Sequence, residues 1–293
     1  MIKNVINKTL RRLGVELKKV DKDIFNLKLY KKLYAEKSLE FKRFYNVGAG
    51  NFYHPYWTNI DYYSDWYKSN DKFTSKGIHH DLFSLTRIPL DNGIAEIVYS
   101  SHTIEHIKDE HAQFFFSEAH RILKNDGLIR ITAPDIDLHY RAYKKNDLDF
   151  FYWRDWYSRE KDYKRINLNQ PLNGASIEQL FLQRFATAAS ILHAHGVKTK
   201  ISDEELNGIF QELKYEDALN YCCDKCTIEI QKKNPGNHTN WWNNEKVINM
   251  LKKAGFKDIW ISGHGQSQSP VLRNNSLFDS THPKISLYIE AMK

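Results

Sequence analysis

The sequence predicts an α/β domain built around a mainly parallel β-sheet. Short apolar segments alternate with helix-like segments, as in chains whose parallel strands are joined by crossover helices. A glycine-rich turn follows the first strand-like segment directly. The chain has 293 residues, of which 41% are hydrophobic and 27% charged. That composition is typical of a globular protein with one large domain, or one domain with an insertion.

Six segments have the apolar composition of strands. They are residues 44–47, 57–61, 95–101, 128–133, 256–261 and 285–291. Two further segments have helical periodicity, and each is followed by a glycine that can stop a helix. These helices are expected at residues 103–123 and 244–254.

The chain divides into four parts by composition. Residues 44–136 and 238–293 form the predicted α/β core. Residues 137–237, between them, are rich in helical signals and aromatic side chains. We expect this helical insertion to cap a substrate site. Residues 1–43 form a basic N-terminal extension.

Basic side chains are concentrated in the N-terminal extension. The net charge is +7, and residues 1–43 alone hold 13 Lys and Arg against 5 Asp and Glu. The remaining chain is nearly neutral, so it lacks the clustered charge of a nucleic-acid surface, and no nucleic-acid partner is expected. Residues 1–20 have apolar positions at helical spacing. Such a basic amphipathic helix packs on protein, including a second subunit, or lies on an anionic membrane surface.

The sequence also predicts where the protein works. No segment is long and apolar enough to cross a membrane, and no secretory signal follows the first basic residues. Three cysteines are an odd number, which argues against a disulfide scaffold and fits a reducing compartment. We therefore expect a cytoplasmic protein, with peripheral membrane contact through residues 1–20 or an oligomer as options.

The first chemical signal is the turn Gly48-Ala49-Gly50, followed by Asp61 at the end of the second strand. Glycine lets a ligand approach the backbone, and a carboxylate in this place can accept hydrogen bonds from both ribose hydroxyls. The alternatives are a tight structural turn for the glycines and a helix cap for Asp61. The order of the elements favours a nucleoside site at the carboxyl ends of parallel strands.

The spacing argues against a dinucleotide. A dinucleotide site has a third glycine and an acid about 20 residues further on. Here Phe52 and Tyr53 follow Gly50, and Asp61 comes soon after. A cofactor without a pyrophosphate is favoured, and an NAD(P)-dependent enzyme remains the alternative. The short stretch around Pro55 leaves little room for the usual parallel crossover.

Seven short motifs together resemble the class I S-adenosylmethionine-dependent methyltransferases. They are NVGAG at 46–50, WTNID at 57–61, HDL at 80–82, IPLD at 88–91, SSHTIEH at 100–106, EAHRILKNDG at 118–127 and AGF at 254–256. The resemblance is to the type-11-like domain found in bacterial surface-polysaccharide and sugar methyltransferases. It implies a Rossmann-like fold, with a mostly parallel seven-stranded sheet, helices on both faces and the helical insertion. Two positions depart from the family pattern, Asn46 in place of an acid and Phe52 in place of a glycine.

The resemblance also implies a site for S-adenosylmethionine, with S-adenosylhomocysteine as product. Its residues would be Gly48, Ala49, Gly50, Asp61, Tyr62, Asp81, Leu82, Ser101 and His102. In this arrangement Asp61 binds the ribose diol and Asp81 meets the adenine. Asp81 also fits the N-cap of a helix that begins at Leu82, and it can do both.

Methyl transfer to a hydroxyl also needs a base. The candidates are His102, His106 and Asp135, and His102 is favoured because it follows the fourth strand at the predicted site. His106 is one helical turn further on, so both histidines can face one cleft. A hydrogen bond from His106 to a backbone carbonyl is an equally good explanation of that residue.

No metal site is expected. His193 and His195 diverge on a helix and have no carboxylate pair nearby. The three cysteines, Cys222, Cys223 and Cys226, offer no fourth zinc ligand and are expected as buried free thiols.

The sequence thus predicts an S-adenosylmethionine-dependent methyltransferase that acts on oxygen of a sugar or a nucleotide-linked glycan precursor in surface-polysaccharide biosynthesis. Two alternatives remain open. One is a methyltransferase for another small metabolite, and the other is a catalytically inactive nucleoside-binding protein of the same fold.

Overall fold

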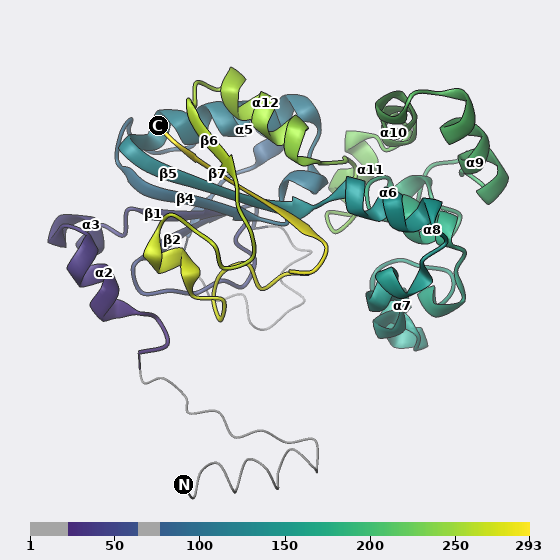
Figure 1. The fold of residues 1–293 in the computed structure, drawn as a ribbon, viewed down its shortest axis with the longest axis horizontal. Helices are drawn as coiled ribbons and strands as arrows, with labels where there is room; N and C mark the ends of the chain where they lie inside the picture. The colour runs from purple at the N-terminus through teal and green to yellow at the C-terminus, as the bar shows by residue number, and fades with distance from the viewer. Residues whose placement is uncertain (1–22, 64–76) are drawn as a thin grey trace, which may run out of the picture.

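The fold is a seven-stranded β-sheet with helices on both faces (Figure 1). The computed structural model describes residues 23–63 and 77–293. The strands are β1 (Phe44–Val47), β2 (Trp57–Asp61), β3 (Ile78–His79), β4 (Ala95–Ser101), β5 (Leu123–Pro134), β6 (Asp258–Ile261) and β7 (Ser286–Met292). Their order in the sheet is β3-β2-β1-β4-β5-β7-β6, and only β7 runs against the others. The predicted mostly parallel α/β sheet is confirmed.

The first crossover is as short as the sequence indicates. β1 pairs in parallel with β2, with Phe44 opposite Trp57, and residues 48–56 form turns without a helix between them. Strands of four or five residues are about 13–17 Å long, so a short loop is enough to return to the start of the next strand.

Alternate side chains of the strands enter two different apolar layers. Tyr45 and Val98 pack with the helices α5 (Asp109–Ile122) and α12 (Asn244–Lys253) on one face. Their sequence neighbours Phe44 and Ile97 belong to the opposite layer. That layer also holds side chains of α2 (Leu27–Leu33), α3 (Glu36–Glu40) and the 3₁₀ segment Pro270–Arg273.

The helix predicted at residues 103–123 is interrupted. The chain forms a 3₁₀ turn at Ile104–His106, and α5 begins only at Asp109. His102 has a φ of 51°, in the left-handed region, and Lys108 is extended, so neither can continue a helix. His102 and His106 are therefore brought together by a tight turn and not by the face of one helix.

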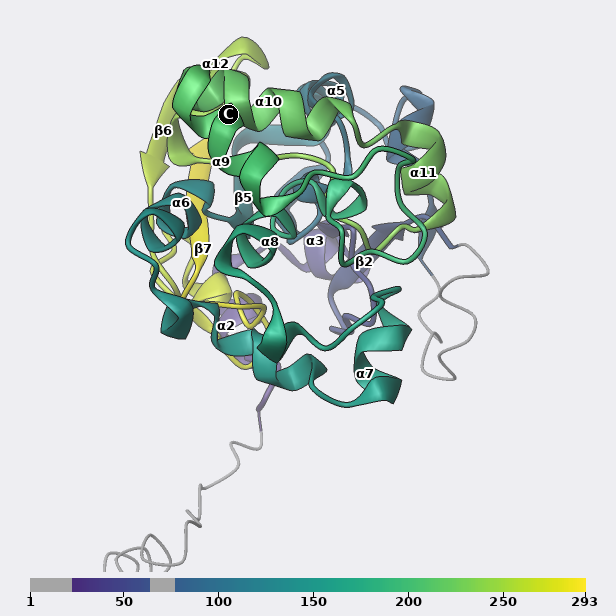
Figure 2. The same cartoon turned by 90° about the vertical axis from the view of Figure 1, so that its right-hand side faces the viewer.

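Six helices lie between β5 and α12. They are α6 (Ile136–Lys144), α7 (Glu160–Arg165), α8 (Ile177–Leu182), α9 (Asp203–Glu212), α10 (Tyr215–Asp224) and α11 (Ile228–Lys233). They have an apolar cluster of their own and lie at one end of the sheet, beyond the carboxyl ends of the parallel strands (Figures 1 and 2). The two connections between these helices and the rest of the domain lie next to each other. There the Ile136 N–H donates a hydrogen bond to the Trp242 carbonyl at 2.9 Å.

The amphipathic helix expected within residues 1–20 lies outside the described residues. In the described part of the extension, Tyr30 of α2 is buried and its hydroxyl accepts from the Trp57 indole at 2.6 Å. None of the helices in residues 23–63 and 77–293 has the length and apolar character of a membrane span.

A buried ion network joins two neighbouring strands. Arg130 of β5 reaches Asp279 at 2.6 Å and Glu290 of β7 at 2.9 Å, and all three side chains are fully buried. Each charge loses several kcal/mol of hydration on burial, so each depends on its partners.

We predict that Arg130→Ala lowers the free energy of unfolding by about 3–5 kcal/mol, because two carboxylates would be left buried without a cation. Arg87→Ala is the control, since Arg87 is largely exposed and lies 4.0 Å from Glu118; it should change stability by about 0.5 kcal/mol or less. Urea unfolding measures both, and equal losses would contradict the assignment.

Candidate functional site

Two neighbouring cavities open at the carboxyl ends of the parallel strands. The first, here called the strand-end cavity, has a volume of about 240 Å³ and extends from Gly48 and Asp61 across to Gly236. The second, here called the histidine cavity, has a volume of about 260 Å³ and lies under the insertion. His102, His106 and Gly236 line both cavities, so what binds in one borders what binds in the other.

Asp61 is held in a fixed orientation at the end of β2. One carboxylate oxygen accepts the Gly50 N–H at 2.7 Å, and the other accepts the Tyr62 N–H at 2.7 Å. Burial raises the pKa of Asp61, and the two N–H donors oppose that effect. Each oxygen keeps a lone pair for a ligand, as a ribose diol requires.

The two glycines of the turn have different reasons to be there. Gly48 has a φ of 70°, and a Cβ would collide with the Thr103 side chain, so this position requires glycine for packing as well as for any ligand. Gly50 has a φ of 52°, and a Cβ there would meet nothing nearby. Ala49 lies between them, is buried and is not part of either cavity wall.

The opposite end of the strand-end cavity is mainly apolar. Asp81, Leu82 and Phe83 line it together with Ile60. Asp81 caps the 3₁₀ turn Leu82–Ser84 by accepting the Phe83 N–H at 2.8 Å, and its other oxygen has no such bond to this turn. This wall suits a flat heterocycle with an exocyclic amine, and the predicted cap is present.

Residues of the insertion form one part of the wall of the strand-end cavity. Gln231 and Lys232 of α11 and the following Pro235 line it. These residues were not predicted, because only the folded insertion brings them next to β1 and β2.

His102 is less free than the sequence suggests. Its Nδ1 lies 3.1 Å from Oε1 of Glu105, and its Nε2 lies 2.8 Å from the Ser286 hydroxyl. That hydroxyl donates to the His282 carbonyl at 2.9 Å, so it accepts a hydrogen bond from the His102 Nε2–H. Because both ring nitrogens already have partners, His102 is better suited to hold Glu105 and Ser286 in place than to take a proton from an acceptor.

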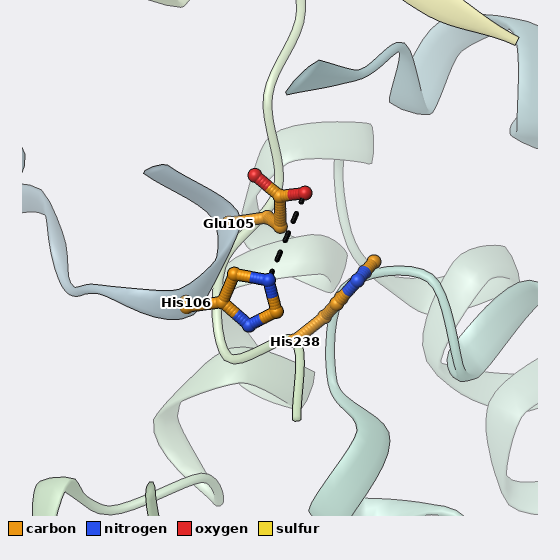
Figure 3. A group of neighbouring side chains, drawn as sticks. All are labelled: Glu105, His106 and His238. Carbon is orange, nitrogen blue, oxygen red and sulfur yellow. Dashed lines mark ion pairs between the residues drawn. The ribbon is translucent and has the colours of Figure 1, made fainter. Parts of the chain in front are cut away.

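Glu105, His106 and His238 form a cluster between the cavities (Figure 3). The His106 Nδ1 lies 2.8 Å from the Asn237 carbonyl, and the His238 Nδ1 lies 2.8 Å from the Arg184 carbonyl. A carbonyl only accepts, so each Nδ1 carries the hydrogen and each Nε2 offers a lone pair. His106 Nε2 lies 3.9 Å from Glu105, and the hydrogen bond to a backbone carbonyl that the sequence left open does exist.

Glu105 is buried, with 1% of its surface exposed. Burial would raise the pKa of Glu105, but the combined interactions with His102, His106 and His238 outweigh burial and lower the pKa to about 2. The pKa of His238 lies well below its usual range, mainly because the ring is buried and secondly because the Arg184 charge is nearby. The cluster therefore contains one carboxylate and at least one neutral imidazole at neutral pH.

One carboxylate oxygen and two imidazole nitrogens of this cluster lie within 4.8 Å of one another, which could suit a transition metal. The residues considered from the sequence do not form such a group. His193 Nε2 lies 3.0 Å from the Asn237 side chain, and its Nδ1 accepts the His195 N–H at 3.1 Å. The three cysteines are free and buried, as expected.

Four predicted residues line neither cavity, namely Ala49 and Gly50 of the turn together with Asp135 and Ser101. Asp135 caps α6 by accepting the Asp137 N–H at 3.0 Å, and it lines neither cavity. Ser101 shares a hydrogen bond with Thr132 at 2.8 Å between β4 and β5 and also lines neither. Their positions at strand ends suggested a role, but their side chains are used within the fold. Asp135 thus caps α6 in the fold, and its role as a base stays a prediction.

Sequence reasoning missed Arg184 and His238, and it gave Glu105 no role. Glu105 stands inside the SSHTIEH motif, so the motif was a signal for it. Arg184 and His238 carry no local pattern, and they reach the site only because α8 and the end of the insertion fold back onto the turn after β4.

Comparison with known proteins agrees with this geometry. Residues 49–131 match the methyltransferase domain family. No curated protein matches the chain. Among solved structures, an S-adenosylmethionine-dependent methyltransferase of Thermotoga maritima is 11% identical, with a TM-score of 0.39 over 99% of this chain and 97% of that one.

A second methyltransferase structure, from Mesorhizobium loti, is 12% identical, with a TM-score of 0.40 over 93% of this chain and 99% of that one. Superpositions this loose carry nothing about activity. The family match covers β2 to β5, where Asp61, Asp81 and the turn after β4 line the strand-end cavity. Residues 49–131 of the α/β core thus match a methyltransferase domain, and the cofactor that this match supports is S-adenosylmethionine.

Proposed function

We propose that the protein methylates an oxygen of a small, hydroxyl-rich acceptor, such as a sugar or a nucleotide-linked glycan precursor, bound in the histidine cavity. The observation that carries this proposal is the wall shared by the two cavities. A methyl donor in the strand-end cavity and an acceptor in the histidine cavity would meet at His102 and His106. The insertion would then act as the cap of the acceptor site.

The residues of the strand-end cavity fit the cofactor. Asp61 would hold the ribose hydroxyls, Asp81 the adenine amine, and the Gly48 backbone would border the methionine part. When bound, S-adenosylmethionine supplies a methyl group activated by a sulfonium. Alignment of donor and acceptor is the main task left to the protein, and it can supply about 7–11 kcal/mol.

The lining of the histidine cavity supports a sugar-like acceptor. Trp153 and Tyr157 offer aromatic surface, and Asn167, Thr187 and Asn237 offer hydrogen-bonding groups. Aromatic faces with polar neighbours suit a ring that has an apolar face and a hydroxylated edge. Trp156 lies outside the lining, and its ring stacks on His282.

His106 is the best-placed base for the acceptor hydroxyl. Its Nε2 lone pair faces the cavities, its Nδ1–H is held by the Asn237 carbonyl, and 26% of its side chain is exposed. Glu105, next to it, stabilises the positive ring that forms when the proton arrives.

The proposal is tested by incubating the protein with S-adenosylmethionine and a panel of sugars, nucleotide sugars and glycan fragments. Mass spectrometry should detect a gain of one methylene in members of this panel. If proteins, nucleic acids or lipids gain mass and no panel member does, the acceptor class is wrong.

Asp61→Asn is predicted to weaken S-adenosylhomocysteine binding about 10- to 100-fold, because it removes the charge from two hydrogen bonds to the ribose. Asp258→Asn is the control, since Asp258 is exposed on β6. Calorimetry measures both affinities. Unchanged binding by Asp61→Asn would place the cofactor elsewhere.

The pH dependence should separate His106 from His238. A general base acts only in its unprotonated form, so methyl transfer should fall at the acidic end of the rate–pH profile. His106→Gln should cost about 100-fold in kcat and remove this acidic limb. His238→Gln should leave the limb in place, because the lowered pKa of His238 keeps this ring neutral. Rate–pH profiles of both variants test this, and loss of the limb only in His238→Gln would reverse the assignment.

Chelation is predicted to leave methyl transfer unchanged. The Arg184 charge acts on His238, and a second cation at the cluster would be repelled by it. Loss of activity after dialysis against EDTA, with recovery on adding Zn²⁺ or Mn²⁺, would instead show that Glu105, His106 and His238 hold a metal.

A further inference from the structure

Arg184 is a buried cation that no carboxylate of residues 23–63 and 77–293 pairs. It follows α8, lines the histidine cavity and has 9% of its surface exposed. Its guanidinium lies over the Trp153 ring, 4.6 Å from the ring centre. Within the same described residues its Nε has no hydrogen-bond partner, and Glu105 attracts the charge without a direct ion pair. The Nε–H group has therefore lost its hydration without a replacement, which is costly.

Two further donors in the same cavity are also unpaired within the described part of the chain. They are the side-chain amides of Gln183 and Asn237. Three residues that line one cavity thus each carry an N–H group without an acceptor in the described part of the chain, which favours a ligand rich in acceptor oxygens. Glu105 Oε1 lies 3.1 Å from His102 Nδ1, but its Oε2 has no partner in the described residues, so the same ligand can donate a hydroxyl there.

The charges around the cavity also favour an anionic ligand at the end where Arg184 lies. Burial is the largest cause that lowers the pKa of His238 and the pKa of His282, and the Arg184 charge is the next largest. Glu105 is the one acidic side chain in the described lining. An anionic group is therefore attracted to the Arg184 end of the lining, and a neutral one gains nothing from it.

We infer that the acceptor carries an oxyanion, either a carboxylate or a phosphate, and that Arg184 binds it with Gln183 and Asn237. This inference rests on the proposed function and narrows it to acidic hydroxylated acceptors. The planar guanidinium fork matches two oxygens of such a group, and its stacking on Trp153 fixes the plane of the fork.

The test uses the full chain saturated with S-adenosylhomocysteine and three probes: glucuronate, glucose 1-phosphate and glucose. Calorimetry should show that at least one acid binds more tightly than glucose, and the stronger acid identifies the oxyanion. Arg184→Gln should weaken that acid by about 30-fold or more and leave glucose unchanged. Arg154→Gln, which removes a guanidinium of the insertion that pairs with Asp149 and Asp155 outside the cavity, should change neither.

Arg184→Lys covers the case in which Arg184→Gln does not fold. It keeps the charge and loses the fork, so it should bind the acid less tightly than wild type but still more tightly than glucose. Equal binding of glucose and both acids to wild type, no binding of either acid, or unchanged acid binding in the Arg184 variants would each overturn the inference. S-adenosylhomocysteine affinity is measured in parallel, because its loss would count against the proposed function and not against the oxyanion site.

Discussion

A single buried carboxylate, Glu105, organises the site between the two cavities. Removing a carboxylate from water costs several kcal/mol, so it has to be offset by the groups around it. Here these are His102 at 3.1 Å, His106 at 3.9 Å and the more distant Arg184. The tight turn Ile104–His106 makes this possible, because it points the carboxylate into the protein and leaves both neighbouring histidines at the cavity walls.

The rest of the site follows from where this turn lies. It begins immediately after β4, at the same edge of the sheet as the ends of β1 and β2. In parallel sheets that edge is where ligands bind. In the proposed function, most of the cofactor residues would come from the strand ends, and the acceptor cavity would be formed by the insertion together with the turn after β4. This arrangement would let one chemistry be combined with a separately shaped acceptor cavity.

The sequence was informative where local chemistry decides the structure. The strands at 44–47, 57–61 and 95–101 agree with β1, β2 and β4, because each is a short apolar run between turn residues. Asp61 could be predicted because it ends a strand, and Asp81 could be predicted because it precedes a short helix.

It was least informative where tertiary contacts decide. The extended backbone of Ile107 and Lys108 interrupts a segment with helical periodicity, and no local pattern predicts that. Asp135 resembles a site residue at a strand end, but it caps the next helix. Arg184 and His238 are 54 residues apart in sequence and meet through the hydrogen bond from His238 to the Arg184 carbonyl.

The central claim is that donor and acceptor meet at the turn after β4. A crystal structure of the complex with S-adenosylhomocysteine tests it most directly. The account predicts that the ribose hydroxyls lie within hydrogen-bonding distance of Asp61 and that the sulfur faces His102 and His106. A ligand seated with its ribose in the histidine cavity, or bound away from the strand ends, would contradict the account.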